Sequence, residues 1–441
     1  MSNAGPRERP ASEHDFRRLW IAQGVSTFGS LITRAALPFT AALVLHASAA
    51  QMAMLAGANL LAALLVAPLA GPWLDRRRRR PVMLACDLVR ALLLASIPFA
   101  ALAGQLSFGR LLAVQALEGA ITTVFDVAQR SWLPELVGEQ RLVRANARLA
   151  TTNSVAEMGS FGVAGWLVQW LGGPTAIAFD ALSYLGSALA LVGIRAPEQA
   201  FSASPALTHG REPARGAETG RRPAPFRGLA AWAADARDGL RLAFADPALR
   251  ALAAVEAVLF TAFGMFMACY TLFAVRELAL PTGPLGMVYG LGGVGSLVAA
   301  LAAPRLATRF GVRACMFAGL SLGAVGLALA VLAPRRVPAA AIALLAAQQL
   351  VGDGGWTLFL VHAESVRMQL APVGARARVA AGASALTVIA RLVGAAVAAG
   401  LAGRFGARGA LAVGAGVVAL AIPLCLGRTL ARGITRASST T

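Results

Sequence analysis

Several acidic residues lie inside long apolar stretches of the sequence, where a charged side chain is costly. Four of them are candidates for proton chemistry, namely Glu118, Glu157, Glu256 and Asp353. An ionised side chain at the centre of a bilayer costs at least about 2.5–3.5 kcal/mol unless it is paired or hydrated. Burial favours the neutral form of a carboxyl group, so a buried acid can take up and release a proton. We therefore predict that one of these residues couples the protein to a proton gradient.

Polar side chains form a stripe along two of the apolar stretches. Gln23, Thr27 and Arg34 recur at helical spacing in one stretch, and Gln115 does so with Glu118 in another. Such faces avoid lipid, so we expect Arg34 and Glu118 to face one another or a water-filled cavity. A structural ion pair that locks two helices together is the alternative.

Aromatic side chains share helical faces with Glu256 and Asp353 in the second half of the chain. This combination suits a bulky, amphipathic and cationic substrate, which would gain apolar contact, ring stacking and a compensating carboxylate. Ordinary helix packing is the alternative interpretation of the same pattern. The aromatic residues are Phe260, Phe263, Tyr270 and Trp356, and Arg391 adds a further charge within an apolar stretch.

The composition places these residues in a membrane protein. Hydrophobic residues make up 57% of the 441 residues and charged residues only 14%, which is too apolar for a soluble chain. Each apolar stretch is near or above the roughly 20 residues that cross a bilayer. We predict an all-α polytopic membrane protein with 12 transmembrane helices. The stretches span about 19–45, 50–70, 81–103, 111–130, 147–171, 175–195, 249–275, 285–303, 314–333, 339–362, 379–403 and 410–427.

The arginines give the chain an orientation. All 40 basic residues are arginine, and the net charge is +19. With both termini cytoplasmic, 31 arginines lie on the cytoplasmic side and 6 on the other side, as the positive-inside rule requires. The basic N-terminus leads into an apolar stretch too long for a cleavable signal peptide. Because the lack of lysine indicates a GC-rich bacterial genome, we predict a multi-pass protein of the bacterial cytoplasmic membrane.

One long polar stretch divides the chain. Residues 196–245 are rich in Pro, Gly, Ser and Arg, and we predict a cytoplasmic linker with a surface helix near 230–242. Residues 1–195 and 246–441 would then form two six-helix bundles.

The two halves also repeat each other. Gly159–Gly165 corresponds to Gly394–Gly400 at an offset of about 235 residues, and Phe28-Gly29 corresponds to Phe263-Gly264. Parallel repeats related by an axis along the membrane normal are a transporter architecture.

Several motifs carry a family resemblance. Between the second and third stretches, residues 71–80 have the pattern G-x-x-x-D-R-x-x-R-R, and Asp87-Leu88-Val89-Arg90, Leu133-Pro134-Glu135 and Asp180-Ala181-Leu182-Ser183 follow. With these motifs the chain resembles the drug/proton antiporter branch of the major facilitator superfamily, which includes macrolide-efflux and enterobactin-export permeases. The resemblance implies the major facilitator fold and an efflux antiporter with a role in drug resistance.

The same resemblance implies a conformational latch. In the family, the loop Asp meets the N-terminal dipole of the eleventh span, and the loop arginines pair with an acid of the fourth span. Such a latch holds the halves closed on the cytoplasmic side, with about 0.3–1 kcal/mol for each charge at a helix terminus. The alternative is that the arginines only set the topology. The matching residues are Gly71, Asp75, Arg76, Arg79, Arg80 and Asp126.

Two positions depart from the family pattern. Gly159 is followed by Ser160, where antiporters often carry a Gly-Pro pair, so this position does not imply export. The corresponding loop of the second half, residues 303–309, lacks both the Gly and the Asp, so the predicted latch is one-sided.

Other function classes are excluded by what the chain lacks. Without lysine it has no P-loop for ATP, and its basic residues form no stripe with interleaved aromatics for nucleic acid. The scattered cysteines and histidines predict no metal site and no cofactor.

We predict a monomeric, non-enzymatic secondary transporter in the lipid bilayer, foremost a proton-coupled exporter of a drug-like or secondary-metabolite small molecule. The alternatives are a lipid flippase, a solute importer, or a non-transporting scaffold or sensor.

Overall fold

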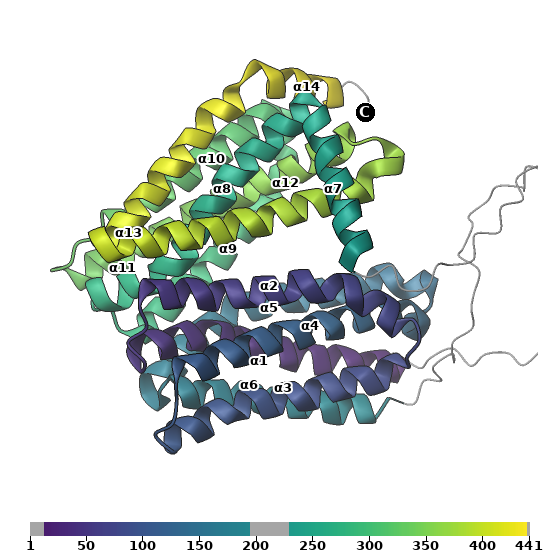
Figure 1. The fold of residues 1–441 in the computed structure, drawn as a ribbon, viewed down its shortest axis with the longest axis vertical. Helices are drawn as coiled ribbons and strands as arrows, with labels where there is room; N and C mark the ends of the chain where they lie inside the picture. The colour runs from purple at the N-terminus through teal and green to yellow at the C-terminus, as the bar shows by residue number, and fades with distance from the viewer. Residues whose placement is uncertain (1–12, 195–228, 439–441) are drawn as a thin grey trace, which may run out of the picture.

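The protein folds into two bundles of long helices (Figure 1). The computed structural model describes residues 13–194 and 229–438, and it contains no strand within these ranges. The predicted all-α class is therefore confirmed. The predicted count of 12 membrane crossings stays a prediction.

The N-terminal bundle contains six helices joined by short turns. Ser48 begins the second helix with a capping box, because its hydroxyl accepts from the Gln51 N–H and the Gln51 side chain accepts from the Ser48 N–H. Gly138 and Gly172, with φ of 74° and 85°, separate consecutive helices in a conformation that only glycine adopts readily. The helices are α1 (Glu13–Leu43), α2 (Ala49–Leu74), α3 (Arg79–Leu102), α4 (Phe108–Val137), α5 (Glu139–Leu171) and α6 (Gly173–Val192).

The C-terminal bundle repeats this arrangement with more irregular helices. Two π-turns extend or interrupt its helices, and Gly406, with φ of 73°, breaks the longest one between the last two predicted stretches. The elements are α7 (Leu229–Ala245), α8 (Pro247–Leu272), η1 (Phe273–Glu277), α9 (Thr282–Phe310), α10 (Val312–Val331), α11 (Pro338–Gln348), η2 (Gln349–Asp353), α12 (Gly354–Leu370), η3 (Val373–Ala375), α13 (Arg376–Leu426) and α14 (Arg428–Ser438).

Eight helices in the described part of the chain are long and apolar enough to cross a membrane. Helices α1 and α5 are not among them, because polar residues interrupt their apolar faces. The predicted linker 196–245 lies partly outside the described residues. Its last part forms α7, at the position of the predicted surface helix, and α7 packs against α13 and α2.

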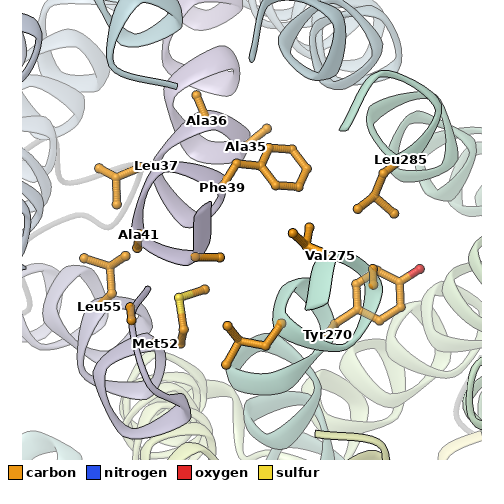
Figure 2. Close-up of a cluster of buried hydrophobic side chains, with 14 of the residues drawn as sticks. Ala35, Ala36, Leu37, Phe39, Ala41, Met52, Leu55, Tyr270, Val275 and Leu285 are labelled. Carbon is orange, nitrogen blue, oxygen red and sulfur yellow. The ribbon is translucent and has the colours of Figure 1, made fainter. Parts of the chain in front are cut away.

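The largest apolar core belongs to both bundles. Figure 2 shows Phe39 of the N-terminal bundle beside Val275 and Leu285 of the C-terminal bundle, with Tyr270 next to Val275. This shared core lies at the end of the molecule opposite the loop that carries Arg76–Arg80. We call the two ends the sealed end and the arginine end.

Each bundle has a core of its own at the arginine end. In the N-terminal bundle this core surrounds Leu74 and Trp132, and in the C-terminal bundle it surrounds Phe359 and Val418. The two halves are therefore joined by apolar packing at the sealed end and are packed separately at the arginine end.

Helices α5 and α9 cross between the halves with their backbones in contact. A Cβ atom added to Gly286 would lie 2.4 Å from the Phe161 carbonyl oxygen and 2.7 Å from the Gly165 Cα. A Cβ atom on Gly165 would lie 2.4 Å from the Thr282 carbonyl oxygen. Small residues at such crossings let two helices approach closely and turn against each other.

We expect Gly286→Ala to weaken the contact between the two halves. The added methyl group meets backbone atoms that cannot rotate away, and overpacking of this kind costs about 1–3 kcal/mol. Thermal unfolding of the purified protein should show a lower midpoint than the wild type. Gly400→Ala is the matched control, because a Cβ atom there meets nothing within 4 Å. Equal midpoints for both variants would contradict the close crossing.

Candidate functional site

A cavity of about 540 Å³ lies between the two bundles. Its walls come from α1 and α5 on one side and from α8, α9, η2 and α12 on the other. This volume lies within the range of small-molecule sites, about 300–1,000 Å³. The shared core closes the cavity toward the sealed end. The predicted site residues on its walls are Arg34, Glu157, Phe263, Tyr270, Asp353 and Trp356.

An aromatic wall covers the C-terminal side of the cavity. The Phe263 and Trp356 rings lie 4.9 Å apart, and the Phe266 and Tyr270 rings lie 4.3 Å apart. Tyr270 continues to Tyr289, 5.5 Å away on α9. Offset and tilted ring pairs at these distances are favourable and leave ring faces available to a flat ligand.

Three charged side chains line the cavity, namely Arg34, Glu157 and Asp353, and a fourth, Arg391, lies against the Phe263 ring of its wall. Arg34 and Glu157 are exposed, whereas Asp353 and Arg391 are partly buried. Within the described residues, none of the four forms an ion pair, and the Arg391 Nε has no hydrogen-bond partner. The Arg391 guanidinium instead lies 4.9 Å from the Phe263 ring centroid.

These charges are segregated by sign. Arg34 of α1 and Arg391 of α13 interact electrostatically with each other, and so do Glu157 of α5 and Asp353 of η2. The cavity therefore has a basic side and an acidic side. A ligand that presents opposite charges to the two sides would compensate both.

A π-turn positions Asp353. Such turns insert one extra residue into a helix and occur often at functional sites. Asp353 ends the π-turn Gln349–Asp353, and its backbone carbonyl accepts a 3.4 Å hydrogen bond from the Ser296 hydroxyl. Its carboxylate occupies space that any side chain at Gly292 would fill, since a Cβ atom there would lie 2.2 Å from Asp353 Oδ2. The glycines of α9 thus give the acid access to the cavity.

Glu118 lies inside the N-terminal bundle and is not among the cavity-lining residues. Its Oε1 accepts hydrogen bonds from Thr122 at 2.7 Å and from Tyr184 at 3.3 Å. Arg34 therefore lines the cavity while Glu118 has separate partners, and the alternative of a structural Arg34–Glu118 pair is wrong. Whether Glu118 carries a proton stays a prediction.

A buried polar network adjoins Glu118. Arg90 pairs with Asp87, donates to Thr122 at 3.3 Å, and lies between the rings of Phe125 and Tyr184. Asp87 and Arg90 were predicted only as parts of a family motif and not as a buried ion pair. Their i, i+3 spacing within an apolar stretch was the available signal for a buried pair.

Glu256 lies apart from the aromatic wall. Its carboxylate pairs with Arg367 of α12, which also pairs with Glu364. Phe260, one turn further along α8, packs edge-on against Trp356 at 5.6 Å and does not line the cavity. The shared helical face of Glu256 and Phe260 therefore does not place either of them on the cavity wall.

The remaining polar candidates lie within the N-terminal bundle. Gln23 donates to Thr27, and Thr27 donates to Asn153 of α5, both at 3.4 Å. These bonds tie α1 to α5. Gln115 is partly buried on α4 and is not among the cavity-lining residues.

The predicted latch residues contact the N-terminal bundle at the arginine end. Arg79 pairs with Glu135 at 3.5 Å, so the predicted pairing with Asp126 is wrong for this arginine. Glu135 lies near the end of α4, level with the loop, whereas Asp126 lies more than two turns deeper.

Arg80 and Asp75 of the same loop have different surroundings. Arg80 donates to the Leu191 and Val192 carbonyl oxygens at the end of α6. Asp75 is exposed and forms no ion pair among the described residues, and Arg76 beside it is exposed as well. A Cβ atom added to Gly71, one turn earlier, would meet nothing within 4 Å. A latch between Asp75 and α13 needs the two halves to approach at this end, and it stays a prediction.

Two hydrogen bonds join the halves at the sealed end by capping helix termini across the interface. Arg276 of η1 donates to the Ala42 carbonyl oxygen at the end of α1, at 2.8 Å. The Gly283 N–H at the start of α9 donates to Oε1 of Gln169 on α5, also at 2.8 Å. Helix ends leave such groups without partners inside the helix. Each half thus satisfies a helix end of the other.

Comparison with known proteins agrees with this arrangement. A sequence model of the family described as Major Facilitator Superfamily matches residues 19–293. The chain is similar to a crystal structure of a bacterial homologue of the iron transporter ferroportin in the inward-facing state, with 19% identity and a TM-score of 0.68 over 93% of this chain and 98% of that one. It is also similar to the nucleoside transporter NupG, with 13% identity and a TM-score of 0.64 over 93% and 96%.

The outward-facing structure of the ferroportin homologue gives a TM-score of 0.54 at 18% identity, over 93% of this chain and 98% of that one. The arrangement of the two bundles is thus nearer to the inward-facing structure. No curated protein matches the chain. At these identities the structural likeness shows the fold alone.

We expect Arg276→Met and Gln169→Leu to open the sealed end more often. Each change leaves one helix end without its partner, and a lost hydrogen bond of this kind costs about 1–3 kcal/mol, which shifts the equilibrium about 5- to 150-fold. A cysteine placed at Ala41, in the shared core, should react faster with a maleimide in both variants. Arg335→Met is the control, because Arg335 pairs with Glu277 inside one half. Unchanged maleimide reaction rates in both variants would contradict the idea that these two hydrogen bonds keep the sealed end closed.

Proposed function

Because the chain belongs to the major facilitator superfamily, it is a membrane transporter of that type, and we propose that it is a proton-coupled exporter of an amphipathic, drug-like small molecule. The observation that carries this proposal is the cavity between the halves, which is closed at the sealed end and lined by three charged side chains that form no ion pair within the described residues. Its family is one of transporters and not of enzymes.

The charge pattern defines the cargo that fits. A cationic group would meet Glu157 and Asp353, and an anionic group would meet Arg34, whose positive charge is reinforced by Arg391 nearby. The aromatic wall between the two sides suits a flat ring. The proposed cargo is therefore an amphipathic molecule with an aromatic ring and both charges.

Asp353 and Glu157 are the proposed proton carriers. Both acids border the cavity, so a proton and the cationic group of the cargo compete for the same carboxylates. When the cargo leaves on one side of the membrane, a proton from that side takes its place on the carboxylate, so the two steps form one exchange. An inward proton at 100 mV supplies about 2.3 kcal/mol, enough for about a 50-fold cargo gradient.

Alternating access requires the two ends to exchange roles. The shared core at the sealed end must separate while the halves approach at the arginine end. The close crossing of α5 and α9 supplies a contact about which the halves can turn. In the closed arrangement of the arginine end, we propose that Asp75 reaches the start of α13 and acts as the predicted latch.

The proposed orientation places the arginine end and both termini in the cytoplasm of a bacterial cell. It rests on the excess of arginines at this end. With this orientation, the present arrangement opens toward the cytoplasm, where an exporter collects its cargo.

The lining of the cavity favours an organic cargo over a metal ion. In the described ranges, no group of three or more His, Cys, Asp and Glu side chains is arranged to hold a metal ion. The cavity instead offers aromatic faces and charges of both signs, which suit an organic molecule.

Binding of a matched probe series tests the proposed cargo. The series is a quinolone carboxylate with a basic amine, its methyl ester, which keeps only the cation, and its N-acetyl derivative, which keeps only the anion. We expect the zwitterion to bind on the order of tenfold more tightly than either derivative, because each charge gains a charge-assisted contact. Quenching of Trp356 fluorescence, with Trp356→Phe as the blank, measures affinity. Tighter binding of a single-charge member would contradict the two-sided cavity.

Transport of the tightest probe tests coupling. In proteoliposomes with an imposed pH gradient, Asp353→Asn should reduce accumulation by about tenfold or more while cargo exchange without a gradient continues, because Glu157 still meets the cationic group of the cargo but position 353 releases no proton. Glu157→Gln tests the second acid in the same way. Glu364→Gln is the control, since Glu364 lies outside the cavity. If both amide variants accumulate cargo as the wild type does, these acids are not the coupling site.

A further inference from the structure

A second cavity, of about 600 Å³, lies at the arginine end of the N-terminal bundle. It is formed by the end of α2, the first three turns of α3, and α4, so it is separate from the transport cavity. Trp73 and Val89 on its rim are 40% and 43% exposed. In a membrane these side chains meet lipid and not another helix. We call this cavity the lateral groove.

The mouth of the lateral groove carries two free guanidinium groups. Within the described residues, Arg77 and Arg78 are exposed and form no ion pair, and the Arg77 guanidinium lies 5.5 Å from the Trp73 ring centroid. Their neighbours differ, because Arg79 is held by Glu135 and Arg80 is held by carbonyl oxygens of α6. Arg77 and Arg78 are thus the pair of the arginine run left available to a ligand.

The ligand that complements this mouth is a phosphate ester. Guanidinium groups bind phosphate oxygens in pairs of parallel hydrogen bonds. Arg78 also occupies the N-cap of α3 without a side-chain capping bond, so the positive end of the helix dipole points the same way.

The walls of the lateral groove are apolar and have the length of one lipid chain. Val82, Ala85 and Val89 line it along α3, and Ile121 and Val124 line it from α4. The distance along α3 from Arg78 to Val89 is about 16 Å at 1.5 Å per residue. One leaflet of a bilayer has a hydrocarbon thickness of about 15 Å, half of the total.

We propose that the lateral groove binds an anionic phospholipid. The phosphate lies against Arg77 and Arg78, the glycerol region lies beside Trp73, and one acyl chain follows α3 past Ala85 to Val89. A free phosphate ion would use only the mouth, and a lipid without net charge would use only the walls. The continuity of the two surfaces in one cavity assigns the lipid as the occupant. This site is independent of the cargo and of proton coupling.

Quenching of Trp73 by brominated lipid tests the proposal. The protein is placed in phosphatidylcholine nanodiscs that contain rising fractions of either phosphatidylglycerol or phosphatidylcholine brominated along one acyl chain. The Trp73 signal is the difference from the Trp73→Phe variant. We expect half-maximal quenching at a fraction of brominated phosphatidylglycerol on the order of tenfold lower than that of brominated phosphatidylcholine, because each arginine near an anionic headgroup adds to affinity.

Matched variants separate the two parts of the site. Arg77→Gln with Arg78→Gln should remove the preference for phosphatidylglycerol, whereas Arg305→Gln with Arg309→Gln should keep it, since these arginines are also exposed but lie at the end of α9 in the other half. Ala85→Phe fills the wall and should weaken quenching by both lipids. Equal quenching of the wild type by the two lipids, or a preference that survives without Arg77 and Arg78, would overturn the proposal. Displacement of the lipid by inorganic phosphate at matched ionic strength would also overturn it, in favour of a free-phosphate site.

Discussion

The shared apolar core at the sealed end is the contact on which the rest of the structure depends. Large side chains such as Phe39, Tyr270 and Leu285 come from both halves, and burying each one is worth about 1.5–3 kcal/mol. Because the halves are joined there, the space between them can widen only toward the arginine end. The cavity, its hydration and its access from one side all follow from this asymmetry.

The intramembrane charges divide into two kinds by their partners. Arg90 has a carboxylate, a hydroxyl and two ring faces around it, so its charge is compensated inside one bundle. Arg34 and Asp353 have no such partners in the described residues and border the space between bundles. Compensated charges stabilise a helix bundle, whereas uncompensated ones are costly unless water or a ligand supplies the missing interaction.

Because apolar length and helical spacing are local properties, the sequence predicted the helical class and named Arg34, Phe263, Tyr270 and Trp356 among the cavity candidates. All four line the cavity. The sequence could not predict that Glu256 pairs with Arg367, since residues 111 positions apart meet only through the packing of α8 and α12. The predicted pairing of Arg79 with Asp126, where the structure has Glu135, failed for a related reason. The depth of a side chain depends on where its helix ends, and helix ends are the least certain feature of a sequence reading.

The reciprocal caps at the sealed end have a consequence for water. When the halves part there, the Ala42 carbonyl and the Gly283 N–H lose the side chains that now satisfy them. Neither group can be left bare at low dielectric, so solvent must replace each lost partner as the gap forms. Opening of this end therefore requires water to enter between Phe39 and Tyr270. The opening rate will depend on how readily water enters there and on how strongly the Arg276 and Gln169 side chains bind the two helix ends.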